Sequence, residues 1–286
     1  MKPAPKKIQR IIEPQPVVEG AGVRLKRSIG TRALDYLDPF LLLDHFASTN
    51  PADYRAGFPL HPHRGIETVT YVLSGVVNHG DTLGNSGSIG AGDIQWMTAG
   101  RGIMHEEMPR VSPEGIAGFQ LWVNLPAKDK MTAPRYQNIH ATEVPEIERA
   151  GGARVRVITG QLDGTHVPVS GIAVAPIYLD VFVPPHGAFM QPVEQGHAAF
   201  SYFFEGAPRI ITGDQGEETL IDPPKLVVWG EGDVINVVTE ESAARFLLVS
   251  GAPLNEPIAR YGPFVMNTNQ EIEQALEDLR QGTFVR

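Results

Sequence analysis

Short runs of alternating apolar and polar residues recur along the chain, separated by segments rich in glycine, proline, asparagine and aspartate. Residues 68–73 and 118–126 alternate in this way. Because side chains alternate between the two faces of a strand, this period predicts half-buried β-strands. In the second run Phe119 and Gln120 would face opposite sides, and one of these faces should line the interior. The pattern predicts an all-β protein built of many short strands.

The second half of the chain repeats the first half in outline. It contains further apolar runs that we predict to be strands, at residues 155–160, 172–183, 200–204, 226–229 and 246–249. Aligning Gly206 with Gly75 superimposes the runs that precede these two glycines. Residues 232–233 then match residues 92–93, a Gly-Asp pair before a strand in both halves. The repeat predicts two similar domains.

The domain boundary is predicted near residue 140. Composition shifts toward polar and charged residues over residues 139–152, which end in Ala-Gly-Gly. We therefore assign residues 1–140 to an N-terminal domain and residues 141–286 to a C-terminal domain. A length of 286 residues is close to the expectation for two domains.

The chain ends with a predicted helix in the C-terminal domain. Thr268 and Glu271 have the spacing of a capping box, and Gly282 is placed to end the helix. Apolar residues follow the cap at helical spacing, namely Ile272, Ala275, Leu276 and Leu279. We expect this apolar stripe to pack within the molecule.

Composition and charge exclude several classes of function. The chain has no cysteine, so disulfides, thiolate nucleophiles and Cys-zinc sites are excluded. A net charge of -9 argues against a direct nucleic-acid interface, which needs a basic surface. The sequence contains no apolar stretch long enough for a membrane span or a signal peptide, so we expect a cytoplasmic protein without membrane contact.

Two pairs of residues have the spacing of metal ligands. His61 and His63 are two positions apart, and so are His105 and Glu107. On extended strands the members of each pair share a face and could bind one ion. The second half lacks such pairs, because Pro192 and Glu194 stand in the place of the first pair in the alignment above. We therefore predict one metal site in the first domain and a metal-free second domain.

The residues alone leave the identity of the carboxylate ligand open. Glu67 follows His63 at a short spacing and competes with Glu107 for this role. Glu106 is a third candidate, although it should lie on the opposite strand face from His105.

Four segments carry a resemblance to a known family. They read HPHRGIETVTYVLSG, DIQWMTAGRGIMHEEMP, GFQLWVNLP and ARYGPFVMNT, and begin at residues 61, 93, 118 and 259. These segments closely resemble the pirin family of the cupin superfamily, which includes quercetin 2,3-dioxygenases, and the likeness spans nearly the whole chain. The resemblance implies two cupin-type, jelly-roll-like β-barrels stacked in one chain. It also implies a single iron-type metal in the first barrel.

The resemblance also selects the ligands. It carries them onto His61, His63, His105 and Glu107. Glu67 has the spacing of the broader cupin pattern, but it falls at a position that is not a ligand in pirins. Three imidazoles and a carboxylate suit Fe(II), which we expect, and also Mn, Co, Ni, Cu or Zn.

Other polar residues near these segments have two interpretations each. Arg64 and Arg101 could orient a ligand or attract an anionic substrate, or they could form salt bridges that shape a loop. Gln120 could lie above the metal or make an ordinary cross-strand hydrogen bond. We assign structural roles to His45 and to His79, which we expect to face solvent or a cross-strand partner.

Two functions are consistent with this sequence. The first is a dioxygenase that cleaves quercetin or a related flavonol with O2 and releases carbon monoxide, with Glu107 as both metal ligand and general base. The second is a non-catalytic, metal-binding and redox-responsive regulator of the transcription-cofactor type, which would act through a protein partner. A cavity large enough for an aromatic substrate and open to the metal favours the enzyme. A closed or water-sized cavity favours the regulator.

Overall fold

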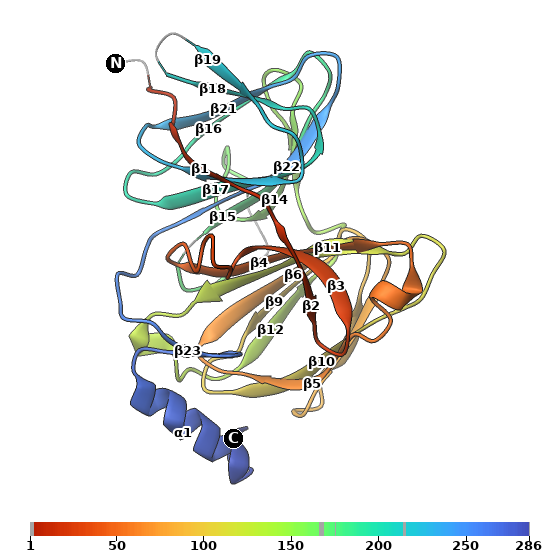
Figure 1. Ribbon diagram of the computed structural model, residues 1–286, viewed down its shortest axis with the longest axis vertical. Coiled ribbons are helices and arrows are strands. Elements are labelled where there is room, and N and C mark those ends of the chain that lie inside the picture. Colours follow the sequence, from red (N-terminus) through yellow and green to blue (C-terminus); the bar gives the residue numbers. More distant parts are fainter. Residues whose placement is uncertain (1–2, 166–168, 175, 214–215, 286) are drawn as a thin grey trace. The chain divides into compact units, whose positions relative to one another are not determined.

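The computed structural model describes residues 3–165, 169–174, 176–213 and 216–285. These residues form two compact units, shown in Figure 1. The first unit comprises residues 15–143, 171–173 and 254–286, as far as they are described. The second comprises the described parts of residues 1–14, 144–170 and 174–253.

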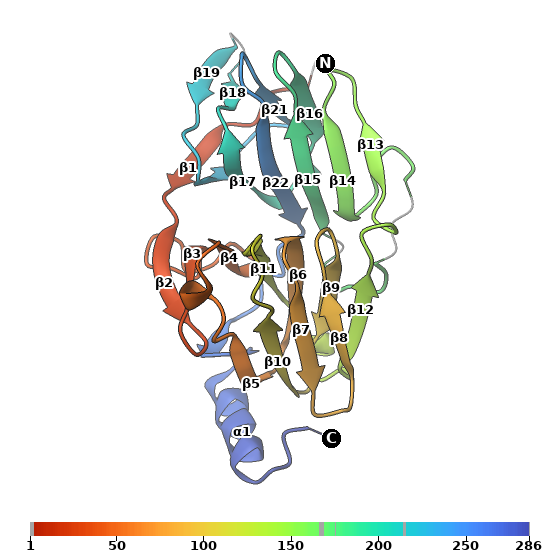
Figure 2. The ribbon, with the colours of Figure 1, turned by 90° about the vertical axis from the view of Figure 1, so that its right-hand side faces the viewer.

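The first unit contains a seven-stranded and a four-stranded antiparallel sheet (Figure 2). The larger sheet has the strand order β12 (Arg135–Ile139), β9 (Ile94–Thr98), β6 (Ile66–Ser74), β11 (Ile116–Asn124), β4 (Phe40–Ser48), β3 (Val23–Ile29) and β2 (Gln15–Glu19). The smaller has the order β5 (Phe58–His63), β10 (Ile103–Pro109), β7 (Val77–Asp81) and β8 (Ser86–Ile89). Two short 3-10 helices, η1 (Pro51–Asp53) and η2 (Ala127–Asp129), lie in the connections.

The alternation that predicted strands β6 and β11 also decides which side chains reach the interior of the first unit. The two strands pair so that Gln120 lies opposite Thr70. Phe119 and Leu121, on the other face of β11, are fully buried. Gln120 and Trp122 line the cavity described below. The predicted division of this strand into two faces is confirmed.

The second unit repeats this arrangement strand for strand. Its larger sheet has the order β1 (Ile8–Ile12), β20 (Lys225–Trp229), β17 (Ala198–Gly206), β22 (Ala244–Gly251), β15 (Ile177–Val183), β14 (Arg154–Thr159) and β13 (Glu146–Glu148). Its smaller sheet has the order β16 (Ala188–Pro192), β21 (Val234–Val238), β18 (Arg209–Thr212) and β19 (Glu217–Leu220).

This topology supports one part of the predicted repeat and corrects another. Gly75 follows β6 and Gly206 ends β17, which hold the same place in their sheets. The match of residues 232–233 with residues 92–93 does not hold. Residues 92–93 precede β9, whose counterpart is β20, whereas residues 232–233 precede β21. Similar Gly-Asp turns at two different strand starts produced the wrong alignment.

Apolar side chains from both sheets fill the interior of the second unit. Three phenylalanines lie at its centre, with ring centroids 5.6 Å apart for Phe189 and Phe246 and 4.8 Å apart for Phe203 and Phe246. All three are fully buried. This close packing is typical of a protein core.

The N-terminal and C-terminal segments do not lie in the domains to which the sequence analysis assigned them. Residues 3–14 are part of the second unit, because β1 pairs with β20 there. Residues 254–285 are part of the first unit, where the hairpin of β23 (Ala259–Tyr261) and β24 (Phe264–Met266) precedes helix α1 (Asn269–Arg280). Buried Ile272 and Ala275 of the helix pack against Phe264 of the hairpin.

The C-terminal helix itself is confirmed, including its predicted cap. The Thr268 side chain accepts a hydrogen bond from the Glu271 backbone N–H, and the Glu271 side chain accepts one from the Thr268 backbone. This reciprocal pair satisfies two backbone donors that a helix start leaves free. None of the helices among the described residues is long and apolar enough to cross a membrane.

Candidate metal centre

The pairing of β5 with β10 brings the two predicted ligand strands side by side. His105 lies opposite His61, and His63 is two residues further along β5. The ligand nitrogens of these three histidines lie within 4.8 Å of one another, and His61 Nε2 is 3.0 Å from His63 Nε2. Two strands separated by 40 positions in the sequence thus form one group of imidazoles.

The environment of these histidines suits a metal ion. His63 and His105 are 2% and 1% exposed. Burial lowers the pKa of both well below its usual value, and neighbouring imidazoles lower it further. The rings are therefore neutral, which is the form that binds metals. Neither ring nitrogen of His105 has a hydrogen-bond partner among the described residues, which fits a side chain that binds an ion.

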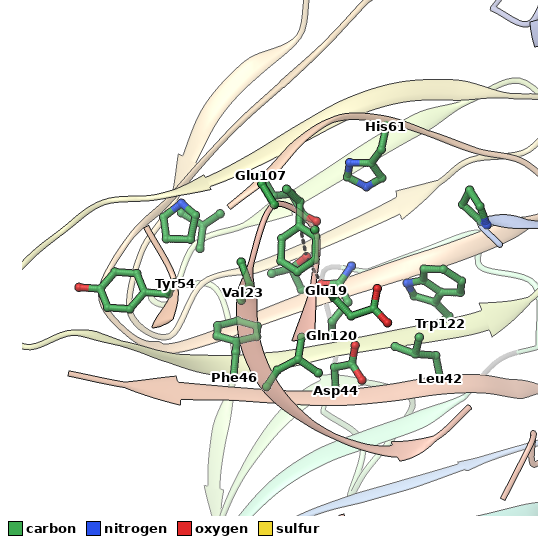
Figure 3. Close-up of a pocket in the computed structure, with 18 of the residues that line it drawn as sticks. Glu19, Val23, Leu42, Asp44, Phe46, Tyr54, His61, Glu107, Gln120 and Trp122 are labelled. Atoms are coloured by element: carbon green, nitrogen blue, oxygen red, sulfur yellow. Dashed lines mark hydrogen bonds between the residues drawn. The ribbon is translucent and has the colours of Figure 1, made fainter. Parts of the chain in front are cut away.

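Glu107 lies next to the histidine group but is not part of it at this distance. It shares a face of β10 with His105, and a register shift between them places Glu107 opposite Phe58. Its Oε1 accepts a hydrogen bond of 3.0 Å from Thr70, whose Oγ1 is also 2.7 Å from Gln120 Oε1 (Figure 3). Burial raises the pKa of Glu107, although His61 and Thr70 act against this. Its role as a ligand stays a prediction.

The two competing carboxylates face elsewhere. Glu67 lies on the face of β6 opposite to Thr70, where its Oε1 accepts a hydrogen bond of 2.8 Å from Thr98. Burial raises the pKa of Glu67. Glu106 is exposed on the outer face of β10. Neither belongs to the histidine group.

A cavity of about 540 Å³ opens onto His61, His63 and Glu107. Its walls carry aromatic and aliphatic side chains, among them Leu42, Phe46, Tyr54, Phe58, Ile116 and Trp122 (Figure 3). The Trp122 indole and the His63 ring are nearly perpendicular, with centroids 5.1 Å apart. The guanidinium of Arg260 covers the same indole at 5.2 Å. The cavity is thus mainly apolar, and the candidate metal ligands lie in one of its walls.

Comparison with known proteins agrees with this geometry. The Pirin family matches residues 22–123, and the Pirin C-terminal cupin domain matches residues 178–285. A pirin-like protein of Caulobacter vibrioides is 44% identical over 97% of this chain and 98% of its own length. Pirin of Homo sapiens is 43% identical over 92% of this chain and 88% of its own length. The chain belongs to the pirin family.

A solved structure shows the same fold. The crystal structure of quercetin 2,3-dioxygenase from Acinetobacter baumannii matches with a TM-score of 0.86 and 35% identity, over 98% of this chain and 99% of that one. The predicted family and the all-β fold of two cupin-type domains with a C-terminal helix are confirmed.

A group of charges in the wall of this pirin's cavity was missed by the sequence analysis. Asp44 receives two hydrogen bonds of 2.7 Å from Arg27, which also donates one of 2.8 Å to Glu19. Asp44 follows a buried leucine run, and such a polar residue in an apolar strand was the available signal. Burial raises the pKa of Asp44, while Arg27 acts against it.

Arg64 has the loop-shaping role that was one of its two interpretations. Its guanidinium lies 2.7 Å from Asp278 of α1 and 4.4 Å from the centre of the Phe284 ring. It is not among the residues that line the cavity, and neither is Arg101. Gln120 does line the cavity and is held by Thr70.

The two histidines assigned structural roles lie in different places. His45 stacks on Phe119 with centroids 4.7 Å apart, and burial lowers its pKa to about 4. His79 is 6% exposed and packs against Tyr136, with centroids 5.8 Å apart. Of the two positions expected for His79, the solvent-facing one is wrong, because the pleat of β7 turns it inward with Val77. The ring lies against Gly87, its cross-strand neighbour on β8.

The second unit has no counterpart to this histidine group in the described part of the chain. Strands β16 and β21 take the places of β5 and β10 in the sheet order. Their buried side chains are Phe189, Gln191, Val234, Ile235 and Val237. Pro192 and Glu194, which the sequence alignment placed at the first ligand pair, are exposed.

Proposed function

We propose that this pirin is a metal-dependent dioxygenase that cleaves quercetin or a related flavonol with O2 and releases carbon monoxide. One observation carries the proposal. The histidine group lies in the wall of a cavity of about 540 Å³ lined mainly by aromatic and aliphatic side chains. Cavities of roughly 300 to 1,000 Å³ accommodate drug-sized ligands, so a flavonol has enough room. The structural similarity to a quercetin 2,3-dioxygenase supports the same assignment.

The metal is proposed to be Fe(II), held by His61, His63, His105 and Glu107. Neutral imidazoles and a carboxylate also accept Mn, Co, Ni, Cu or Zn, so the donor set alone does not select the ion. When bound, such an ion supplies a Lewis acid and, for a redox-active metal, an electron relay to dioxygen. Proton transfer and substrate binding require side chains of the protein.

Glu107 is proposed to accept the proton that the flavonol hydroxyl must lose before its ring becomes electron-rich enough to react. The carboxylate lines the cavity, so a bound hydroxyl can come within hydrogen-bond distance of it. Thr70 holds Oε1 from the β6 side. The hydroxyl of Thr70 has one hydrogen for two acceptors, Glu107 and Gln120, so it can donate to either as the charge on Glu107 changes.

The apolar walls are proposed to bind the planar ring system and to exclude water. Trp122 and Phe46 supply aromatic surface, and burial of such area contributes about 25 cal/mol per Å² to binding. Exclusion of water strengthens the hydrogen bonds made at Glu107 and protects the activated ring from unwanted protonation.

The test is anaerobic purification with elemental analysis, followed by oxygen uptake and carbon monoxide release with a panel of flavonols. We expect about one transition metal per chain, because the described residues contain one histidine group. Consumption of a flavonol with release of carbon monoxide supports the proposal. If no flavonol is consumed with Fe, Mn, Co, Ni or Cu, the dioxygenase proposal fails. The regulatory function, exerted through a protein partner, then becomes the better hypothesis.

A further inference from the structure

Strand β5 needs support from outside its sheet. It carries His61 and His63, yet it is the edge strand of the four-stranded sheet, and β10 is its one partner strand among the described residues. Its register with β10 shifts between His105 and Glu107, close to the ligands. His63 is the last residue of β5, so the backbone pairing with β10 ends at the residue whose imidazole has to be held in place.

The C-terminal segment, residues 263–284, supports the end of β5 through the backbone. Arg64 N donates to Pro263 O at 3.4 Å, and Val265 N donates to Arg64 O at 3.1 Å. Gly65 has a φ of +80°, and a Cβ on this residue would lie 2.0 Å from Val265 O. Only glycine permits so close an approach of the two backbones. The turn after His63 is therefore built against this segment.

A buried lysine joins the same parts. Lys130 Nζ donates to Gly65 O at 2.9 Å, to Val265 O at 2.8 Å and to Asn124 Oδ1 at 2.8 Å. All three ammonium hydrogens have acceptors, which makes burial of the charge tolerable. Burial still lowers the pKa of Lys130, to about 8.

A buried ion pair joins this turn to helix α1. Arg64 Nη1 is 2.7 Å from Asp278 Oδ2, and the two side chains are only 4% and 14% exposed. The guanidinium also lies over the Phe284 ring and donates to Phe284 O at 3.4 Å. The other oxygen of Asp278 accepts a hydrogen bond of 2.8 Å from Gln274. The geometry of such a charged hydrogen bond is well defined, so it fixes the position of residue 64 relative to helix α1.

The His63 ring shows what this support is for. Its Nε2 faces His61, while its Nδ1 is buried without a hydrogen-bond partner among the described residues. Pro263, whose backbone oxygen accepts a hydrogen bond from Arg64 N, lines the same cavity as His63. Metal-binding histidines usually donate their second ring N–H to such an acceptor, which fixes the ring orientation.

We propose that the C-terminal segment is a positioning element for the metal centre. The Arg64–Asp278 pair and the β23–β24 hairpin hold the end of β5, and with it the His63 ring within the histidine group. Arg64 and Asp278 are positioning residues that set the affinity for the metal without touching it. This inference requires metal binding by the histidine group and is independent of any reaction with flavonols.

The test compares D278N with the matched control E277Q in the full-length protein. Glu277 neighbours Asp278 on α1, but its side chain pairs with Arg280, which is 72% exposed, and accepts a hydrogen bond from Gln281, and neither of these contacts Arg64. Loss of an outer-shell partner weakens metal binding about ten- to hundredfold. We expect D278N to raise the Kd for Ni(II) in a chelator competition by that factor and to alter the visible spectrum of the Co(II)-loaded protein. E277Q should match wild type in both, and D278E should recover most of the affinity.

Several outcomes would overturn the inference. One is a D278N protein with the wild-type Kd and Co(II) spectrum, even if its melting temperature falls, because the helix would then contribute only to stability. Failure of the wild type to bind Ni(II) or Co(II) is another. If D278N does not fold, the R64K variant tests the inference instead, since lysine keeps the positive charge but lacks the planar guanidinium with its several donors. An R64K protein with unchanged metal affinity and spectrum would also refute the proposal.

Discussion

The two units of this pirin have the same strand order and different interiors. In the first, inward positions of β5, β6, β10 and β11 carry histidines, Glu107, Thr70 and Gln120 around a cavity. In the second, the corresponding sheets enclose Phe189, Phe203 and Phe246. The fold accepts either filling, so the site depends on a few side chains at inward positions and not on the arrangement of strands.

The interiors of the two units also differ in what contributes to their stability. Buried polar groups cost free energy unless they are paired, and the first unit contains several that lack partners among the described residues, including both ring nitrogens of His105. The second unit buries aromatic area that contributes to its stability. We expect the first unit to depend on its metal for part of its stability, whereas the second depends on packing.

The largest expected effect is loss of metal after substitution of a ligand in the first unit. His63→Ala removes one of three imidazoles and should weaken metal binding by more than about a hundredfold, which exceeds the loss usual for an outer-shell partner. His197→Ala, in the second unit, should leave metal content unchanged. Elemental analysis of both proteins, purified in parallel, measures the difference. Full occupancy in His63→Ala, or half occupancy in His197→Ala, would contradict the assignment of the site to one unit.

The next effect separates a packed interior from a cavity wall. Phe246→Ala removes a fully buried ring from the second unit and should lower the free energy of unfolding by about 3 to 5 kcal/mol. Phe46→Ala removes a half-buried ring that already faces the cavity, and should cost about 1 to 2 kcal/mol. Urea unfolding followed by circular dichroism measures both. Equal losses would show that the two interiors are packed alike.

Within the first unit, Glu107 and Glu106 are adjacent residues on opposite faces of β10. Glu107→Gln keeps the shape and one ligand oxygen but removes the basicity, so turnover should fall about a hundredfold or more. Glu106→Gln alters an exposed side chain and should retain wild-type activity. Flavonol consumption and carbon monoxide release are compared on metal-matched proteins. If wild type turns over and Glu107→Gln is equally fast, another group or water is the base.

The smallest effect concerns pH. The pKa of His45 is lowered from 6.5 to about 4 by burial, so between these values the unfolded chain binds a proton that the folded chain does not. Stability should therefore fall as the pH drops from 6.5 toward 4. His45→Phe keeps the stacking on Phe119 and removes this titration, so the loss of stability between pH 7 and pH 5 should be smaller in this variant by about 2 kcal/mol. Hydrogen exchange of β4, compared with β15 of the second unit, measures the effect. An unchanged loss in His45→Phe would show that other groups cause it.

Much of this protein could be predicted from local pattern. Alternation along β6 and β11 indicates strands, because the period of two is a property of the extended backbone itself. The capping box of α1 is equally local. The pairs His61–His63 and His105–Glu107 could be found because residues two apart share a strand face, whatever the strand pairs with.

The tertiary structure alone decided which distant segments meet. Strand β1 pairs with β20, and the C-terminal segment packs within the unit that carries the histidines, because buried side chains and unpaired strand edges find partners without regard to distance along the chain. The same holds for side-chain direction. The pleat of a paired strand turns Glu67 away from the histidines and His79 toward the interior, and only the pairing of the sheets shows where each face leads.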